Sequence, residues 1–180
     1  MSLLLISGSL RDGSTNTALL RTARAIDGDC ELFAGMGALP HFSPDDDHDD
    51  LTVAVRELRA ATGRADALLV CTPEYAGALP GAFKNLLEWL VGGGEAYRKP
   101  IAWINVSGPA APSGGADAHD SLRKVVGYIS MEIIEEACVR IAVTRNAIGA
   151  DGLIADPAIR EPLATALVAL REGAARVEPL

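Results

Sequence analysis

Five short apolar runs alternate along the chain with longer stretches in which apolar residues recur every three or four positions. The short runs indicate buried β-strands, and the longer stretches indicate amphipathic α-helices. Strands that are too apolar to face water on either side belong in a parallel sheet covered by helices on both faces. We therefore predict an α/β fold with strands at 3–6, 30–33, 65–71, 101–106 and 139–143, and helices over about 15–27, 51–62, 80–91, 118–137 and 157–177.

The loop after the first run, residues 7–17, is crowded with hydrogen-bond donors. Its sequence SGSLRDGSTNT carries hydroxyl, amide and guanidinium groups, and it leads into a helix whose first N–H groups are unpaired. These features predict a phosphate site. A P-loop would need lysine where Ser14 stands, and a dinucleotide loop would need glycine where Leu10 stands, so we expect a terminal monophosphate. The alternative is an ordinary turn capped by one hydroxyl, which leaves Arg11 and Asn16 unexplained.

Two further loops, at 72–81 and 107–115, are rich in small residues and glycine. With strand order 2-1-3-4-5, the loops after strands one, three and four lie side by side at the carboxyl edge of the sheet. Glycine lets backbone groups approach a planar ligand, so a flat ligand is expected beside the phosphate. Taken singly, Tyr75 could equally belong to the core and Glu74 to a solvated turn, and turns such as Ser107-Gly108 are common.

Composition excludes several other classes of function. The formal net charge of −8 disfavours nucleic acid as a partner. The 180 residues suit a single domain over 1–180, and we expect neither a membrane-spanning segment nor a signal peptide. Three separated cysteines favour reduced thiols and a cytoplasmic location. The acidic run at 45–50 favours solvated carboxylates, and no metal site is predicted.

Two motifs, in this order, resemble those of a known family. The first is S-G-S-L-R-x-x-S-x-N at 7–16, and the second is P-E-Y-x-G-x-x-P-G-x-x-K-N at 73–85. Together they resemble the NADPH-dependent FMN reductase family of flavodoxin-like proteins, over about residues 2–145. The resemblance implies a flavodoxin-like three-layer sandwich with a five-stranded parallel sheet. It also implies FMN as the cofactor and NADPH or NADH as the hydride donor.

The resemblance also implies which residues bind the cofactor. The family usually has asparagine at the position of Ala76, so one side-chain hydrogen bond near the flavin is expected to be missing. No arginine cluster marks a 2′-phosphate pocket, and the choice between NADPH and NADH stays open. The residues expected to hold the FMN phosphate are Ser9, Arg11, Ser14, Asn16 and Thr17, and those expected around the isoalloxazine ring are Pro73, Glu74, Tyr75, Ala76, Gly77, Ser107 and Gly108.

The expected activity is transfer of electrons from NAD(P)H through FMN to a small-molecule acceptor: a free flavin, a quinone, an azo compound or an oxidised metal ion. The flavin supplies the chemistry, so no catalytic side chain is predicted. The resemblance implies a homodimer or homotetramer. One alternative is an FMN-binding electron carrier or redox sensor, which Arg11 disfavours because flavodoxin phosphate loops usually lack arginine. The other is a non-redox protein that binds a phosphorylated metabolite, which would leave the 73–81 loop unexplained.

Overall fold

The chain folds around one parallel β-sheet with helices on both faces. The computed structural model describes residues 1–108 and 111–177. The sheet order is β2-β1-β3-β4-β5, with β6 also paired to β4, and every pairing is parallel. This confirms the predicted order 2-1-3-4-5. The strands are β1 (Leu3–Ser7), β2 (Cys30–Phe33), β3 (Ala67–Cys71), β4 (Pro100–Asn105), β5 (Glu132–Ile133) and β6 (Val139–Arg140).

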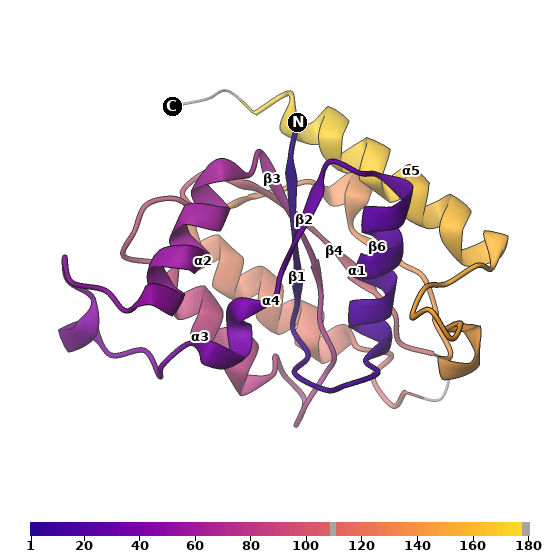
Figure 1. Cartoon of the computed structure of the whole chain (residues 1–180), viewed down its shortest axis with the longest axis horizontal. Helices are drawn as coiled ribbons and strands as arrows, with labels where there is room; N and C mark the ends of the chain where they lie inside the picture. The colour runs from indigo at the N-terminus through magenta and orange to yellow at the C-terminus, as the bar shows by residue number, and fades with distance from the viewer. Residues whose placement is uncertain (109–110, 178–180) are drawn as a thin grey trace.

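The helices form the two outer layers. In Figure 1, α1 and α5 lie on one side of the sheet, and α2, α3 and α4 lie on the other. β1 runs down the page, so the carboxyl edge of the sheet is at the bottom of that view. The helices are α1 (Thr15–Ile26), α2 (Val53–Arg64), α3 (Gly81–Trp89), α4 (Ala116–Ile129) and α5 (Pro157–Ala174).

The apolar strands serve two cores, one on each face of the sheet. In β1, Leu3 and Leu5 pack in the core beneath α1 and α5. Leu4 and Ile6 pack in the opposite core, with α2, α3 and α4. All four side chains are fully buried. Because successive side chains of a strand point to opposite faces, a strand between two helical layers has to be apolar at every position.

The fifth strand differs from its prediction. The expected helix at 118–137 ends at Ile129, where Ser130 adopts φ 62°. The expected strand at 139–143 is present as β6, which begins at Val139 but ends at Arg140, and it is preceded by an unpredicted strand, β5. The two pair with the end and the beginning of β4, respectively, on either side of a short 3-10 turn. The reason lies in Met131 and Ile134, which are buried in opposite cores. Residues three positions apart lie on opposite faces of a strand but on the same face of a helix. An extended segment can therefore place Met131 and Ile134 in opposite cores, and a helix cannot.

The acidic run also differs from its prediction at one position. Most of its carboxylates are exposed, but Asp47 is largely covered and accepts a hydrogen bond from Arg59, with Nη2–Oδ1 at 2.7 Å. Arg59 is buried and also donates from Nε to the carbonyl of Trp89. This pair ties the 35–50 connection to α2 and to the end of α3. No group of three metal-ligating side chains occurs among the residues described, and none of their helices could span a membrane.

Candidate functional site

The loop after β1 turns sharply and lies close to β3. The N–H of Gly8 donates to the carbonyl of Cys71 at 2.9 Å. A Cβ at position 8 would lie 2.3 Å from Oγ1 of Thr72, so only glycine allows this approach. The Ser7 and Thr17 hydroxyls are hydrogen bonded at 2.8 Å, and the N–H of Ser9 donates to Ser7 Oγ at 3.3 Å. The beginning of the loop is therefore held from both β3 and α1.

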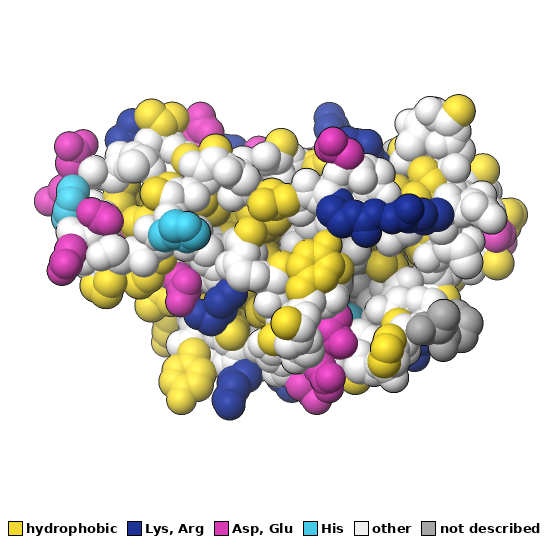
Figure 2. Space-filling view, turned by 90° about the horizontal axis from the view of Figure 1, so that it is seen from below, with side chains coloured by type: hydrophobic (Ala, Val, Ile, Leu, Met, Phe, Trp, Pro, Cys, Tyr) yellow, Lys and Arg dark blue, Asp and Glu magenta, His cyan; other side chains and the backbone are white. Residues whose placement is uncertain are grey.

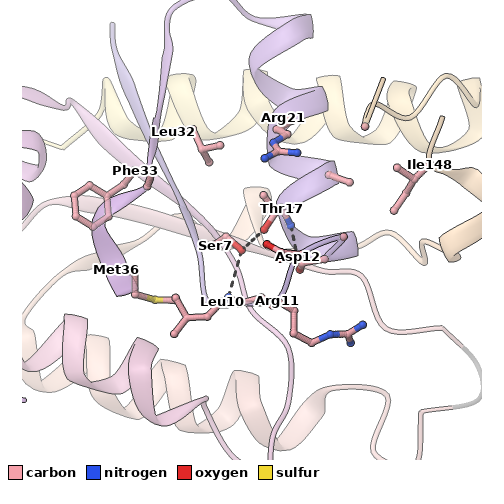
Figure 3. A pocket seen from close by; sticks show the side chains of 16 residues that line it. Ser7, Leu10, Arg11, Asp12, Thr17, Arg21, Leu32, Phe33, Met36 and Ile148 are labelled. Carbon is pink, nitrogen blue, oxygen red and sulfur yellow. Dashed lines mark hydrogen bonds between the residues drawn. The ribbon is translucent and has the colours of Figure 1, made fainter. Parts of the chain in front are cut away.

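Ser14 caps the helix that follows the loop. Its Oγ accepts a hydrogen bond from the N–H of Thr17 at 3.4 Å, as the turn interpretation expected. The cap uses the hydroxyl as an acceptor and leaves its proton available to a ligand. The positive end of the α1 dipole lies at the same place. Arg11 is exposed, and Figure 3 shows its guanidinium pointing away from Leu10.

Asn16 lies beneath the loop, where its side chain is held by a cysteine. It is 5% exposed, and its Oδ1 accepts a hydrogen bond from the thiol of Cys71 at 3.2 Å. Burial raises the pKa of the Cys71 thiol far above its ordinary value, so the thiol keeps the proton that it donates. With Oδ1 occupied, the NH₂ group of Asn16 is the part of the amide that can donate to a ligand. Sequence reasoning identified Asn16 but missed Cys71, which is 55 positions away along the chain.

The loop after β3 contains a tight two-residue turn. Tyr75 and Ala78 exchange backbone hydrogen bonds at 3.1 and 3.2 Å. Between them, Ala76 and Gly77 both have positive φ, 53° and 71°. This is the geometry of a type I′ turn, which favours glycine or asparagine at both central positions. Tyr75 is 44% exposed, so it belongs to the surface of the loop and not to the core.

Glu74 joins this loop to the loop after β4. One carboxylate oxygen, Oε2, accepts hydrogen bonds from the Ser113 hydroxyl at 2.6 Å and from the N–H of Ala118 at 3.3 Å. Ala118 lies in the first turn of α4, where a negative charge is stabilised by unpaired N–H groups. Glu74 is therefore not a solvated turn residue, because its carboxylate holds the two loops together.

The loop after β4 is held by two residues that sequence reasoning missed. Asn105 accepts from the N–H of Ser107 at 2.8 Å and donates to the carbonyl of Gly114 at 2.7 Å. Arg140, on β6, donates to the carbonyl of Ser107 at 3.1 Å from Nη2. Because Arg140 lies on β6, beside the end of β4, its guanidinium lies against this loop. Pro109 and Ala110, which the predicted loop includes, lie outside the described residues.

Asn85, the last residue of the motif at 73–85, holds the connection that follows β2. Asn85 on α3 donates to the carbonyl of Pro40 at 2.8 Å and accepts from the N–H of Phe42 at 2.7 Å. The indole N–H of Trp89 donates to the same Pro40 carbonyl at 2.9 Å. Asn85 and Trp89 thereby hold the 40–42 segment against α3. Asn85 was part of the quoted motif, but the sequence alone assigned it no role.

Nine of the twelve predicted site residues border two cavities at the carboxyl edge of the sheet. The loops after β3 and β4 enclose one of about 300 Å³, which also reaches the start of α1. A neighbouring cavity of about 450 Å³ lies across the β1 loop. Tyr75, Ala76 and Gly77 line neither. Of the other predicted residues, Asn16, Pro73, Glu74, Ser107 and Gly108 line the first cavity, and Ser9, Arg11, Ser14 and Thr17 line the second.

Charge is unevenly spread over this edge. Figure 2 looks onto it and shows Lys or Arg side chains beside hydrophobic ones across the middle of the face. Histidine and several acidic side chains lie at its left end, and further acidic side chains lie along its upper margin and in its lower middle. In a chain with a formal net charge of −8, an anion at this edge therefore depends on local donors, which the β1 loop supplies.

The fold and the loops at its carboxyl edge define a doubly wound α/β protein of the flavodoxin-like class. The sequence model described as NADPH-dependent FMN reductase matches residues 1–144. The chain belongs to this family.

Two relatives agree with that assignment, and one solved structure agrees with the fold. A probable NADPH:quinone oxidoreductase 2 from Oryza sativa is 31% identical over 188 aligned residues, covering 96% of this chain and 88% of that protein. An NAD(P)H-dependent FMN reductase from Pseudomonas aeruginosa is 32% identical over 170 residues, covering 92% and 91%. The flavoenzyme FerB of Paracoccus denitrificans, an NAD(P)H:(acceptor) oxidoreductase, matches in fold with a TM-score of 0.79 at 24% identity, covering 96% of this chain and 98% of that one.

Proposed function

We propose that this protein binds FMN at the carboxyl edge of its sheet and passes electrons from NAD(P)H to a quinone or azo compound. The observation that carries the proposal is the convergence of the donor-rich β1 loop with the two small-residue loops at the carboxyl edge of the sheet, around two neighbouring cavities, in a chain of the NADPH-dependent FMN reductase family. Relatives named as a 2-hydroxy-1,4-benzoquinone reductase and an NADPH azoreductase, 32% and 33% identical, support this class of acceptor.

The donors of the β1 loop fit the phosphate of FMN. Ser9 and Ser14 offer hydroxyl protons, Arg11 offers a guanidinium that can hold two oxygens, and Asn16 offers its NH₂ group. Thr17 lies in the first turn of α1, where the positive end of the helix dipole favours a negative charge. A dianion at this helix end also interacts favourably with the helix dipole.

The loops after β3 and β4 fit the ring of FMN. No hydrogen bond occupies the N–H groups of Ala76 and Gly77 among the backbone bonds of the described residues, so both can donate to a ring edge. Pro73 and Glu74, the residues of this loop that precede the turn, border the 300 Å³ cavity, with Ser107 and Gly108 on the facing loop. FMN supplies the hydride chemistry when bound. The side chains and backbone of this protein orient the ring and place NAD(P)H against it.

A spectroscopic titration tests the proposal. Purified protein mixed with FMN is expected to bind it, and anaerobic NADPH or NADH is expected to bleach the flavin absorbance. Adding a quinone should then restore it. Bound flavin that NAD(P)H leaves unbleached would overturn the reductase in favour of an electron carrier or sensor. Failure to bind FMN at all would favour the non-redox phosphometabolite protein.

Arg11→Ala tests the phosphate assignment. Losing a charged hydrogen bond of about 1.5–3 kcal/mol should weaken FMN binding by roughly 10- to 100-fold. Arg24→Ala is the matched control, because Arg24 is an exposed arginine on α1 that lines neither cavity. Unchanged FMN affinity in the Arg11 variant would show that the phosphate lies elsewhere.

An apolar groove between α3 and α4 supports a homodimer or homotetramer. Leu87 and Val91 face Val125 and Tyr128 across it, and Tyr128 is 87% exposed. An exposed apolar patch of this kind favours association. We further propose that the chain is one domain over 1–180 in the cytoplasm, which its reduced cysteines support. Sedimentation of the wild type against Tyr128→Glu tests the assembly.

A further inference from the structure

The guanidinium of Arg140 is fixed against the loop after β4. It donates two hydrogen bonds to the carbonyl of Ser107, from Nε at 3.3 Å and from Nη2 at 3.1 Å. Gly114 allows this close approach, because a Cβ at position 114 would lie 3.0 Å from Nη1. No ion pair joins Arg140 to a carboxylate within residues 1–108 and 111–177, so its positive charge is directed at the loop without a neutralising partner.

The peptide group between Ser107 and Gly108 directs its N–H away from this guanidinium. In a trans peptide the C=O and the following N–H point in opposite directions, and no described peptide bond is cis. The Ser107 carbonyl points to Arg140, on the strand β6 that flanks one side of β4. The Gly108 N–H therefore points toward the other side of β4. There β3 is the neighbouring strand, and Pro73 and Glu74 border the cavity of about 300 Å³ together with Gly108.

Asn105 holds the same loop from its other end. Its Oδ1 accepts from the N–H of Ser107 at 2.8 Å, and its Nδ2 donates to the carbonyl of Gly114 at 2.7 Å. Both backbone groups of Ser107 are thus bonded within the protein, which leaves only its hydroxyl for a ligand. Among the described residues, nothing accepts a hydrogen bond from the Gly108 N–H. This N–H is therefore a fixed backbone donor that the loop presents to the cavity.

The charge of Arg140 strengthens this donor through the peptide group. Hydrogen bonds in a chain polarise one another, so a cation at the carbonyl of a peptide makes its N–H a stronger donor. A stronger donor stabilises an anionic acceptor more than a neutral one. Arg140 itself does not line the cavity, so it acts on the cavity only through the loop.

We propose that Arg140 is a positioning residue that orients and polarises the Ser107–Gly108 peptide, so that the Gly108 N–H stabilises reduced FMN over oxidised FMN. The proposal rests on the proposed function, because it takes the flavin ring to lie in the cavity that Gly108 borders. NAD(P)H gives two electrons and one proton as hydride and leaves as NAD(P)⁺, so the ring gains one negative charge. Arg140 sets how strongly that charge is stabilised.

The test compares the reduction potential of bound FMN in the wild type and in variants at Arg140. Arg140→Gln removes the charge and should weaken binding of reduced FMN about 5- to 10-fold more than binding of oxidised FMN, which lowers the two-electron potential by about 20–30 mV. Arg140→Lys keeps the charge and should restore most of the difference. Arg145→Gln is the matched control, because Arg145 is an exposed arginine on the segment after β6 that borders neither cavity, and it should leave the potential unchanged.

A second measurement needs no flavin. In the FMN-free protein, the amide proton resonance of Gly108 should move upfield in Arg140→Gln, because a less polarised N–H is less deshielded, and it should stay in place in Arg145→Gln.

FMN binding by the wild type and its bleaching by NAD(P)H are measured first, so a failure of the proposed function appears before any variant is compared. Equal potentials for the wild type and Arg140→Gln would overturn the present proposal alone. So would an equal loss of affinity for oxidised and reduced FMN, because that result would make Arg140 only a structural support of the loop. An unmoved Gly108 resonance in Arg140→Gln would likewise show that the peptide is not polarised.

Discussion

The turn at Ala76 and Gly77 makes a sharp prediction about stability. Both residues have positive φ, and Ala76 is the one with a Cβ. An L-residue in this conformation costs about 1–2 kcal/mol, which glycine does not incur. Replacing alanine by glycine also gives the unfolded chain more freedom, which costs about 0.4–1 kcal/mol. Ala76→Gly should therefore stabilise the folded state by about 0.5–1 kcal/mol.

Gly77→Ala is the matched opposite change. Nothing lies within 4 Å of a Cβ at position 77, so the substitution introduces backbone strain without a steric clash. It should destabilise the folded state by about 0.5–1 kcal/mol, by the same two contributions with reversed sign. For a chain of this size, each change corresponds to a shift in Tm of about 1–4 °C.

The assay is thermal unfolding of the FMN-free protein, so that ligand binding does not enter the comparison. The expected order of Tm is Ala76→Gly above wild type, and wild type above Gly77→Ala. Ala76→Asn should also lie above wild type, because asparagine tolerates left-handed backbone better than alanine. A lower Tm for Ala76→Gly than for wild type would refute the account of strain in this turn.

Three further predictions concern the loops and the buried thiols. Gly8→Ala should cost about 1–3 kcal/mol in urea unfolding, because its Cβ would meet Thr72 Oγ1 at 2.3 Å. Glu74→Gln should weaken the hydrogen bonds that join the loop after β3 to Ser113 and Ala118, and it should lower the free energy of unfolding by about 1 kcal/mol. Hydrogen exchange at the Ala118 N–H should then be faster. Burial raises the pKa values of Cys30 and Cys138 to about 11. Above about pH 9 the unfolded chain releases thiol protons that the folded chain keeps, so the free energy of unfolding should fall with rising pH.

Stability measured from about pH 8 to about pH 10.5 checks the thiol prediction. Cys30→Ala and Cys138→Ala together are expected to make the decline shallower, and the part that remains is due to Cys71, whose pKa burial also raises. A free energy of unfolding that is level over this range in the wild type would contradict it. Gly28→Ala serves as a control for the change at Gly8, because a Cβ there meets nothing within 4 Å. Glu57→Gln serves as the control for Glu74, since Glu57 is an exposed carboxylate on α2.

Much of the fold could be predicted because its signals are local. Of the first four strands, β1, β3 and β4 are short, mostly apolar runs, and β1 is apolar on both faces because it lies between two helical layers. The donors of the 7–17 loop are likewise adjacent in sequence. The fifth strand could not be predicted from periodicity, because Met131 and Ile134 enter different cores. Their spacing of three residues is that of a helix, and only packing against the sheet distinguishes the two.

What the sequence determined by itself is therefore the alternation of strand and helix and the chemistry of the first loop, since both depend on residues close together along the chain. The tertiary structure alone decided which distant residues meet. Cys71 donates to Asn16, Glu74 reaches the first turn of α4, and Arg21 shares a cavity with Phe33. These contacts depend on strand order and register, which set distances between residues that no local pattern relates.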